Sequence, residues 1–430
     1  MLVEFSVTNY LSFCETQILG LTAGSTLDEY PENAFDAGVA RMPPLLKSMV
    51  VYGANASGKS NLIRAIKFVQ EFVLNSAKGQ EGDPIPITPF RLSARSANAP
   101  SVFELTFVQN GVRYQYGFAA TRERVQHEWL LAYPKGRAQR WFERYFDPMS
   151  GEEEWHLHRS FLSSARNTWR DMTRSNALFL STAVQLNSEE LRPVFDWFAK
   201  KLYVLPPHSD ISMDFTTHQV KKPEQREKVM AFLNHADLNI QNILVNRRTA
   251  DGADGSESGG DPNYLNTLHA LLKKKLEDWE WEIIDIQFER TTHDTGEPIA
   301  LPWNTESQGT QKLFALAGPW IDMMENDRIL FIDEMDTSLH HNLVQFLFGL
   351  VHAQEGISRS QLICTTHDTA LLSSDGFRRD QYWMAQKNDH RCTTLYPVTR
   401  FNVGKSVPLQ KRYLAGDYGA IPTIRRFGDL

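Results

Sequence analysis

Residues 53–60 constrain the fold of this 430-residue chain more than any other segment. They read Gly-Ala-Asn-Ala-Ser-Gly-Lys-Ser and match the pattern G-x-x-x-x-G-K-S. The apolar run at 49–52 before them predicts a buried strand, and apolar residues recur at helical spacing through 61–74 after them. A strand, a glycine-rich loop and a helix in this order are typical of a loop that binds phosphate groups.

Each residue type in this loop suits a phosphate chain. The backbone N–H groups of the loop and the N-terminus of the helix attract anions. We expect Lys59 to reach the outer phosphates and the Ser60 hydroxyl to ligate Mg²⁺. The sequence therefore predicts a nucleoside triphosphate site. Its predicted contact residues are Gly53, Asn55, Ser57, Gly58, Lys59, Ser60 and Asn61.

A second segment ends in two carboxylates. Residues 328–334 read Arg-Ile-Leu-Phe-Ile-Asp-Glu, so four apolar residues predict a buried strand. In phosphate-loop enzymes, an acid at such a strand end holds the Mg²⁺ shell, which assigns that role to Asp333. Glu334 is then expected to polarise the attacking water as general base. The alternative is a strand that ends in solvated acids, and the phosphate loop upstream favours the functional interpretation.

Two further segments are weaker anion-site candidates. The strand predicted at 361–366 ends in His367, which would lie on the same sheet edge as the acids and contact the γ-phosphate. A structural histidine is the alternative. Ser307 and Gly309 form a Ser-x-Gly turn that opens an apolar stretch at 313–321. Such a turn at a helix start binds anions, although the pattern is common.

Composition narrows the class of protein. The chain has 42% hydrophobic residues and a net charge of −7, so no global basic field favours nucleic acid, and any such binding would need a local patch. The three cysteines, Cys14, Cys364 and Cys392, have no paired or metal-ligand spacing, which fits a reducing cytosol. Without an apolar run near 18 residues or a signal peptide, we expect a cytoplasmic protein with no membrane partner.

Hydrophobic patterns predict the remaining elements. Residues 1–21 alternate as strands, and 101–146 form an antiparallel meander with a hairpin turn at Asn110-Gly111. The other expected elements are helices at 188–200, 223–245 and 265–279, a mobile loop at 249–263, and a hairpin at 284–302 that turns at 294–296.

The order of these motifs resembles that of ABC-type ATPases. The long middle segment between Ser60 and Asp333 resembles the Rad50, SMC and RecF-like branch. More narrowly, the chain is similar to compact bacterial anti-phage defence ATPases of AAA domain 15 or 21 type, such as the RloA-, AriA- and PtuA-like proteins. The segments that support this resemblance are 5–13, 176–187, 333–340 and 413–422.

The resemblance implies further roles by position. Gln185 corresponds to the glutamine that couples Mg²⁺ and the γ-phosphate to the helical lobe. Ser307 and Gly309 correspond to the signature that caps the γ-phosphate of the other protomer, and Asp336 to the D-loop acid. Ser12 falls in the N-terminal loop near the base. The signature here reads Glu-Ser-Gln-Gly-Thr-Gln and the D-loop Asp-Thr-Ser-Leu-His, so both depart from the common pattern.

The implied fold class is α/β: an ABC-type P-loop NTPase core with an antiparallel β lobe and an inserted, mostly helical lobe. Residues 1–186 and 284–430 would form the core, and 187–283 the insertion. The implied function is an ATP-binding and ATP-hydrolysing sensor or scaffold of an anti-phage defence system. It would dimerise around ATP and Mg²⁺, respond to a phage-derived trigger, and control a separately encoded effector such as a TOPRIM or HNH nuclease.

Two other functions stay open. One is a RecF- or SMC-like repair or chromosome-maintenance ATPase that DNA activates, and the other is a scaffold that hydrolyses nucleotide too slowly to cycle.

Two stretches mix arginine and aromatic residues, one around Arg140 and Arg144 and one around Arg166 and Arg170. Such a mixture suits a contact with nucleic acid or an acidic protein, or else a solvated face. The pair His156 and His158 lacks the companion ligands of a metal site.

Overall fold

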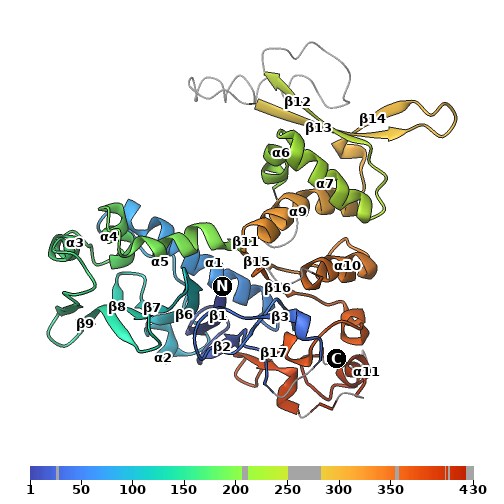
Figure 1. Ribbon diagram of the computed structural model, residues 1–430. Helices are drawn as coiled ribbons and strands as arrows, with labels where there is room; N and C mark the ends of the chain where they lie inside the picture. The colour runs from blue at the N-terminus through green and yellow to red at the C-terminus, as the bar shows by residue number, and fades with distance from the viewer. Residues whose placement is uncertain are drawn as a thin grey trace, which may run out of the picture. The chain divides into compact units, whose positions relative to one another are not determined.

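The computed structural model describes residues 1–25, 29–205, 212–249, 282–353, 358–401, 403–404 and 407–422. The chain divides into two compact units, Met1–Ile211 with Asp322–Leu430, and Ser212–Ile321. Figure 1 shows their elements. Apart from Thr249, the loop expected at 249–263 and the helix expected at 265–279 lie outside the described residues.

A mostly parallel six-stranded sheet is the centre of the first unit. Its strand order is β11-β15-β16-β5-β17-β18, and only β18 runs antiparallel to its neighbour. β5, β15 and β16 are uniformly buried apolar runs, as expected for strands covered on both faces. The strands are β5 (Ser48–Tyr52), β11 (Leu202–Val204), β15 (Ile329–Ile332), β16 (Gln361–Thr365), β17 (Tyr382–Lys387) and β18 (Thr393–Pro397).

This sheet places three predicted motifs at one edge. β5 leads into the phosphate loop and then into α1 (Lys59–Asn75). β15 ends directly before Asp333 and Glu334, and β16 ends two residues before His367. Because β15, β16 and β5 pair in parallel, their carboxyl ends meet at the same edge, which is where α/β sheets bind ligands.

The second sheet is antiparallel and has seven strands in the order β10-β9-β8-β7-β6-β1-β2. It confirms the predicted N-terminal strands and the meander. The turn between β6 and β7 has positive φ at both Asn110 and Gly111, as the predicted hairpin requires. The strands are β1 (Leu2–Thr8), β2 (Gln17–Gly20), β6 (Ser101–Gln109), β7 (Val112–Ala120), β8 (Val125–Tyr133), β9 (Gln139–Asp147) and β10 (Glu152–Leu157).

Helix α1 joins the two sheets through one hydrophobic core. Its residues Phe68 and Phe72 pack on Phe118 of β7, and Phe68 also packs on Phe103 of β6. The same buried cluster includes Val51 of β5. The helix that follows the phosphate loop is therefore fixed by the core of the whole unit.

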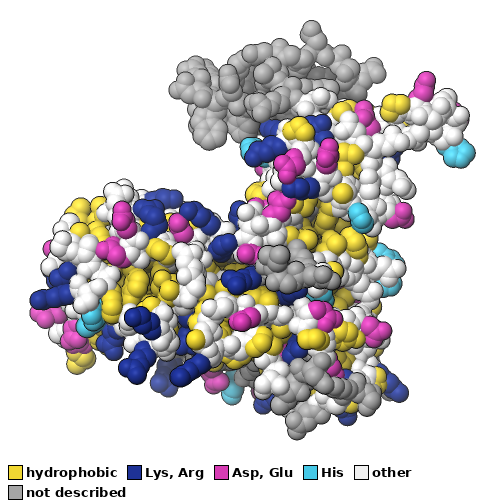
Figure 2. All heavy atoms as spheres, viewed as in Figure 1, with side chains coloured by type: hydrophobic (Ala, Val, Ile, Leu, Met, Phe, Trp, Pro, Cys, Tyr) yellow, Lys and Arg dark blue, Asp and Glu magenta, His cyan; other side chains and the backbone are white. Residues whose placement is uncertain are grey.

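A buried ion pair fixes the short helix α4 (Phe179–Gln185). Glu128 and Arg144 are 0% and 2% exposed, and their side chains approach to 3.1 Å. The Glu128 carboxylate also accepts hydrogen bonds from the backbone N–H groups of Phe179 and Leu180. The idea that Arg144 belongs to an exposed basic patch is therefore wrong. Figure 2 shows basic and acidic side chains mixed on the visible face.

The N-terminal strands lie beside the C-terminal hairpin, as Figure 1 shows. The backbone N–H of Leu395 in β18 donates to the Gln17 side chain at the start of β2. A disulfide joins Cys14 to Cys392, and Cys364 is buried and takes no part in this bond. The expectation of unpaired cysteines is wrong because the fold, and not the spacing in sequence, brings Cys14 and Cys392 together.

The second unit contains helices and a three-stranded antiparallel sheet in the order β12-β13-β14. The hairpin predicted at 284–302 is present. The helix predicted at 223–245 is wrong beyond His235, because the chain adopts positive φ at Asp237 and Asn239 and then forms β12. The elements are α6 (Asp214–Val220), α7 (Pro223–His235), β12 (Asn242–Thr249), β13 (Glu282–Thr291), β14 (Pro298–Pro302) and α9 (Gln308–Glu325), whose last residues belong to the first unit.

The segment predicted as a helix at 188–200 forms α5 (Arg192–Asp196) followed by the wider turn η3 (Trp197–Lys201). Ser188 accepts a hydrogen bond from the Leu191 N–H, as a capping residue does. This segment belongs to the first unit, so the compact insertion begins at Ser212. Further α-helices and strands of the described residues are β3 (Ala34–Phe35), β4 (Leu45–Leu46), α2 (Ala94–Ala97), α3 (Arg166–Asp171), α10 (His341–His352) and α11 (Leu409–Leu414).

Candidate nucleotide-binding site

The phosphate loop has little room for side chains at its two glycines. A Cβ atom at Gly53 would collide with the Ala385 carbonyl and the Ser57 side chain. Gly58 has φ of 110° and precedes α1, and a Cβ atom there would collide with Thr393 and Ser12. Gly58 is therefore required by its backbone conformation and by close contacts, and Gly53 by close contacts alone.

Lys59 lies inside the loop that it follows. Its Nζ donates to the backbone carbonyls of Gly53 at 2.8 Å and Ala54 at 3.3 Å. Burial lowers the pKa of Lys59, while the carboxylates of Glu334, Asp333 and Asp336 act in the opposite direction. The parallel pairing of β5 with β16 and of β16 with β15 places the lysine and the predicted acids at the same sheet edge.

Thr365 connects the two predicted acids at the end of β16. Its hydroxyl donates to Asp333 Oδ1 at 2.6 Å and accepts from the Glu334 backbone N–H at 2.7 Å. Glu334 has a positive φ of 47°, an uncommon conformation for a non-glycine residue. One buried hydroxyl therefore sets the positions of both residues, and neither acid is simply a solvated strand end.

Asp336 holds the segment that contains His367. Its carboxylate accepts from the Thr366 hydroxyl at 2.7 Å and from the His367 backbone N–H at 3.2 Å. Burial lowers the pKa of His367, and the Lys59 charge adds to this effect. The lowered pKa favours the neutral imidazole, and the ring N–H can donate a hydrogen bond toward a phosphate oxygen.

The side chains at this edge suit a hard cation and a phosphate chain. Asp333 is 3% exposed, and its Oδ2 is a buried atom without a hydrogen-bond partner. The Ser57 Oγ is also buried and without a partner. Ser60 is the second residue of α1 and is half-buried. Carboxylate and hydroxyl oxygens are the ligands that Mg²⁺ prefers, so Asp333 and Ser60 fit a Mg²⁺ site.

The remaining predicted loop residues have distinct environments. Asn55 is exposed at the tip of the loop. Asn61 donates from its side chain to the Ser12 hydroxyl at 2.8 Å, which places Ser12 at the start of α1.

Among the described residues, no contact brings Gln185 to the cluster around Lys59 and Asp333. It is the exposed last residue of α4. Ser181 of the same helix donates to the Val73 carbonyl, near the far end of α1. At 1.5 Å per residue, Val73 lies about 20 Å along the helix from Lys59. The role of Gln185 stays a prediction from resemblance.

The signature residues lie in the second unit, at the start of α9. The Ser307 Oγ accepts from the Thr310 N–H at 3.1 Å and thus caps the helix. Ser307 is exposed and Gly309 is half-buried. An exposed helix start of this kind can bind an anion, which suits the signature role. That role stays a prediction.

Sequence reasoning missed Thr365 and Thr366. Both are fully buried, and their hydroxyls orient three predicted site residues, Asp333, Glu334 and Asp336. Two threonines at the end of an apolar strand, directly before His367, are a signal that could have found them. Their role becomes visible only when β16 is seen to pair with β15.

The fold and this site define a P-loop nucleotide-binding protein. A family model described as "AAA domain, putative AbiEii toxin, Type IV TA system" matches residues 48–373. The chain belongs to this family. No curated protein matches the chain.

Solved SMC head domains are similar to the chain at low identity. The SMC head domain from Thermotoga maritima has 14% identity and a TM-score of 0.40, and the match covers 92% of this chain and 98% of that one. An SMC head bound to the C-terminal winged-helix domain of ScpA has 13% identity and a TM-score of 0.44, with coverages of 93% and 99%. An SMC head with an extended coiled coil, bound to the C-terminal domain of ScpA derived from Pyrococcus furiosus, has 13% identity and a TM-score of 0.40, with coverages of 93% and 97%.

The described residues contain neither a membrane-spanning helix nor a cluster of three metal-ligating side chains. None of their helices is both long enough and apolar enough to cross a membrane. No group of three or more His, Cys, Asp or Glu side chains among them is arranged to hold a metal ion. A Mg²⁺ site of the P-loop kind needs fewer protein ligands, because phosphate oxygens and water complete the shell.

Proposed function

We propose that this chain binds ATP with Mg²⁺ and hydrolyses it, and that it acts as the sensor or scaffold subunit of a bacterial anti-phage defence system. The observation that supports the ATPase activity best is the linked set of Lys59, Asp333, Thr365 and Glu334 at one sheet edge. In this set, the free oxygen of Asp333 is buried beside a phosphate loop.

Each side chain has a proposed task. Lys59 and the loop N–H groups bind the outer phosphates, and Ser60 and Asp333 hold Mg²⁺, which offsets phosphate charge. Glu334, held through its backbone N–H by Thr365, accepts a proton from the attacking water. His367 donates a hydrogen bond from its ring N–H to the γ-phosphate. Asp336 positions His367 through the backbone.

The signature, in which Ser307 is exposed and Gly309 is half-buried, supports a dimer as part of the proposal. In the proposed dimer, two protomers face each other head to tail, and Ser307 of each protomer caps the γ-phosphate that the other protomer holds. ATP binding closes the dimer and hydrolysis opens it, because the closed state binds ATP more tightly than the open state. Gln185 would report the nucleotide state to the inserted unit.

The family description supports the defence role over repair, since it names a component of a toxin–antitoxin system. The net charge of −7 and the burial of Arg144 also favour it over activation by DNA. The proposal includes a cytoplasmic location, a phage-derived trigger and a separately encoded effector such as a TOPRIM or HNH nuclease. A RecF- or SMC-like ATPase remains the second candidate.

The solution mass of Glu334→Gln with and without ATP and Mg²⁺ tests the proposal. This variant should bind ATP without hydrolysing it, and light scattering should show its mass double when nucleotide is added. Lys59→Ala is the control and should neither bind ATP nor double. A monomer in both conditions would remove the role of Ser307 in the partner's site, and normal turnover by Glu334→Gln would remove Glu334 as the base. Stimulation of hydrolysis by DNA would favour the second candidate.

A further inference from the structure

Two buried hydroxyls outside the motif bear directly on the phosphate loop. Thr393, the first residue of β18, has its Oγ1 2.7 Å from the Ser57 carbonyl oxygen and 2.7 Å from the Ser12 Oγ. Asn61 of α1 donates to the same Ser12 Oγ at 2.8 Å. Thr393 is 0% exposed and Ser12 is 9% exposed.

These contacts form a chain of hydrogen bonds with one direction. The Thr393 hydroxyl has a single proton, and the Ser57 carbonyl can only accept, so Thr393 donates to Ser57. Ser12 must then donate to Thr393, and it accepts from the Asn61 amide. The chain therefore runs from the first turn of α1 through Ser12 and Thr393 back to the loop and fixes the segment between them.

The fit around Gly58 shows how closely these side chains approach the loop. A Cβ atom at Gly58 would collide with the Thr393 side chain and would lie 2.8 Å from the Ser12 Oγ. A shift of either hydroxyl by a fraction of an ångström would therefore change the contacts of Gly58, the residue just before Lys59. The backbone N–H groups at this point are those that bind phosphate in a P-loop.

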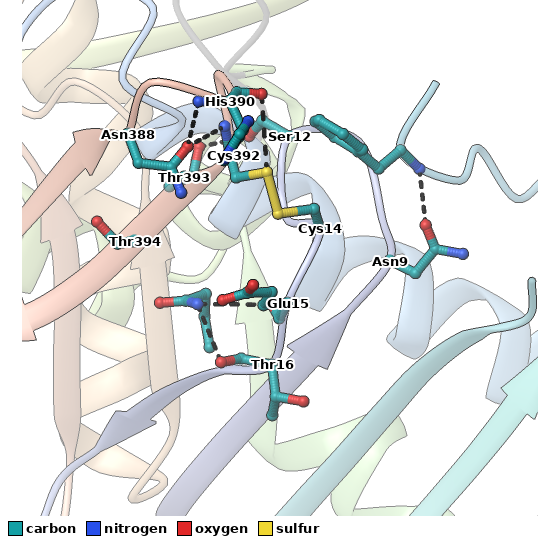
Figure 3. The surroundings of a disulfide bond; sticks show 12 residues. Asn9, Ser12, Cys14, Glu15, Thr16, Asn388, His390, Cys392, Thr393 and Thr394 are labelled. Atoms are coloured by element: carbon teal, nitrogen blue, oxygen red, sulfur yellow. Dashed lines mark hydrogen bonds between the residues drawn. A yellow bond between two sulfur atoms is a disulfide. The ribbon is translucent and has the colours of Figure 1, made fainter. Parts of the chain in front are cut away.

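The disulfide holds the two segments that supply these hydroxyls. Cys14 is two residues after Ser12, and Cys392 is the residue before Thr393. Figure 3 shows the bond between the segment after β1 and the β17–β18 hairpin. Besides the disulfide, the Thr393 backbone N–H donates to the Ser12 carbonyl at 2.8 Å. The pair of hydroxyls is thus held by one covalent bond and by weaker polar contacts.

The surroundings make this pair reachable by small thiols. Cys14 is half-buried, and the next two residues, Glu15 and Thr16, are exposed. Residues 388–391, which form the tip of the hairpin before Cys392, are exposed as well. Asn388 holds the tip by accepting hydrogen bonds from the backbone N–H groups of His390 and Cys392. Reaction at Cys14 therefore needs no opening of the core.

We propose that Ser12 and Thr393 are positioning residues for the phosphate loop, and that the Cys14–Cys392 pair makes their positioning depend on thiol oxidation. The oxidised chain then binds nucleotide more tightly than the reduced chain, because the loop is already ordered before nucleotide arrives. This inference rests on the proposed function, since it assigns regulation to the same nucleotide site.

The redox step is an exchange with a low-molecular-weight disulfide such as oxidised glutathione. The Cys14 thiolate attacks one sulfur and releases one small thiol, which leaves a mixed disulfide. The Cys392 thiolate then displaces the second small thiol and closes the protein bond. Two protein thiols are oxidised, one small disulfide is reduced to two thiols, and the two protons go to those thiols. An excess of dithiol reverses the exchange.

The test compares oxidised and reduced full-length chain directly. Peptide mass mapping first verifies the Cys14–Cys392 link after treatment with oxidised glutathione and its loss after dithiothreitol. The dissociation constant for ATP with Mg²⁺ is then measured for both forms, and we expect oxidised chain to bind about tenfold more tightly, the effect of ordering one or two hydrogen bonds. Cys14→Ser should bind like reduced chain in both conditions, and Cys364→Ala should keep the difference.

A second pair of variants separates positioning from general stability. In the oxidised chain, Thr393→Val removes the hydroxyl but keeps the shape, and should weaken ATP binding about tenfold while the turnover number changes little. Thr393→Ser restores the hydroxyl and should restore affinity, which a purely structural role of the methyl group would not explain. Equal effects of both variants would overturn the positioning role.

The outcomes distinguish this inference from the proposed function. If both forms bind ATP with the same affinity, or if the link does not form, the thiol dependence is refuted and the ATPase proposal stands. If neither form binds ATP while the link forms and breaks as described, the nucleotide site itself is refuted, and the regulation assigned to it is refuted with it.

Discussion

The buried histidine at the end of α10 gives the first unit a pH dependence that follows from its contacts. His352 is 8% exposed, and its Nε2 lies 2.8 Å from the Ser48 Oγ and 3.2 Å from the Gln381 Nε2. The Gln381 Nε2 can only donate, so the His352 Nε2 must accept and carries no proton. The neighbouring Lys47 cation also disfavours a charged ring.

Burial, with Lys47 as the second cause, lowers the pKa of His352 from 6.5 to about 4. An unfolded chain takes up a proton at this residue as the pH falls through about 6.5, while the folded chain takes it up only near 4. The stability that the neutral ring contributes is therefore full above pH 6.5 and is lost as the pH falls through this window. Between pH 7 and pH 5, the loss is about 2 kcal/mol.

Hydrogen exchange of the β5 and β17 amides measures this loss, because these strands flank the histidine's partners. The free energy of opening should fall between pH 7 and pH 5 in the unaltered chain. Because the glutamine in His352→Gln cannot titrate, the fall in this variant should be smaller by about 2 kcal/mol. His156→Gln changes an exposed histidine on β10 and should keep the full dependence. Equal losses in His352→Gln and the unaltered chain would refute the assignment.

Two further substitutions test buried polar contacts. Thr365→Val removes the partner of the Glu334 N–H, so urea unfolding should show a loss of stability of about 1–3 kcal/mol. Thr394→Val removes an exposed hydroxyl and should cost about 0.5 kcal/mol or less. Equal losses of stability in the two variants would contradict the role of Thr365. Glu128→Ala leaves the Arg144 charge buried and unpaired and should cost about 3–5 kcal/mol. The double variant Glu128→Leu with Arg144→Met should be more stable than Glu128→Ala, and a less stable double variant would show that the ion pair is not replaceable.

The parts of the fold that the sequence predicts are those with local signals. The phosphate loop between β5 and α1, the acids after β15 and the β6–β7 turn all depend on residues within a few positions of one another. Their periodicity and turn chemistry are sufficient because the physical cause is local. The α/β class, which the family resemblance implied, is confirmed by the two large sheets and the helices packed on them.

The parts that the sequence did not predict depend on distant partners. Arg144 has the composition of a surface patch, and its burial follows from Glu128 on the neighbouring strand. Thr365 becomes a site residue only because β16 pairs with β15. The link between Cys14 and Cys392 spans 378 residues. None of these contacts has a local pattern.

The position of β5 in the sheet has a consequence for synthesis of the protein on the ribosome. β5 emerges early, but both of its neighbours, β16 and β17, are translated more than 300 residues later. At about 5–20 residues per second, the central strand waits for roughly 15 to 60 seconds with its edges unpaired. The phosphate loop likewise gains its hydrogen bond from Thr393 only after that residue has been translated, long after the loop itself.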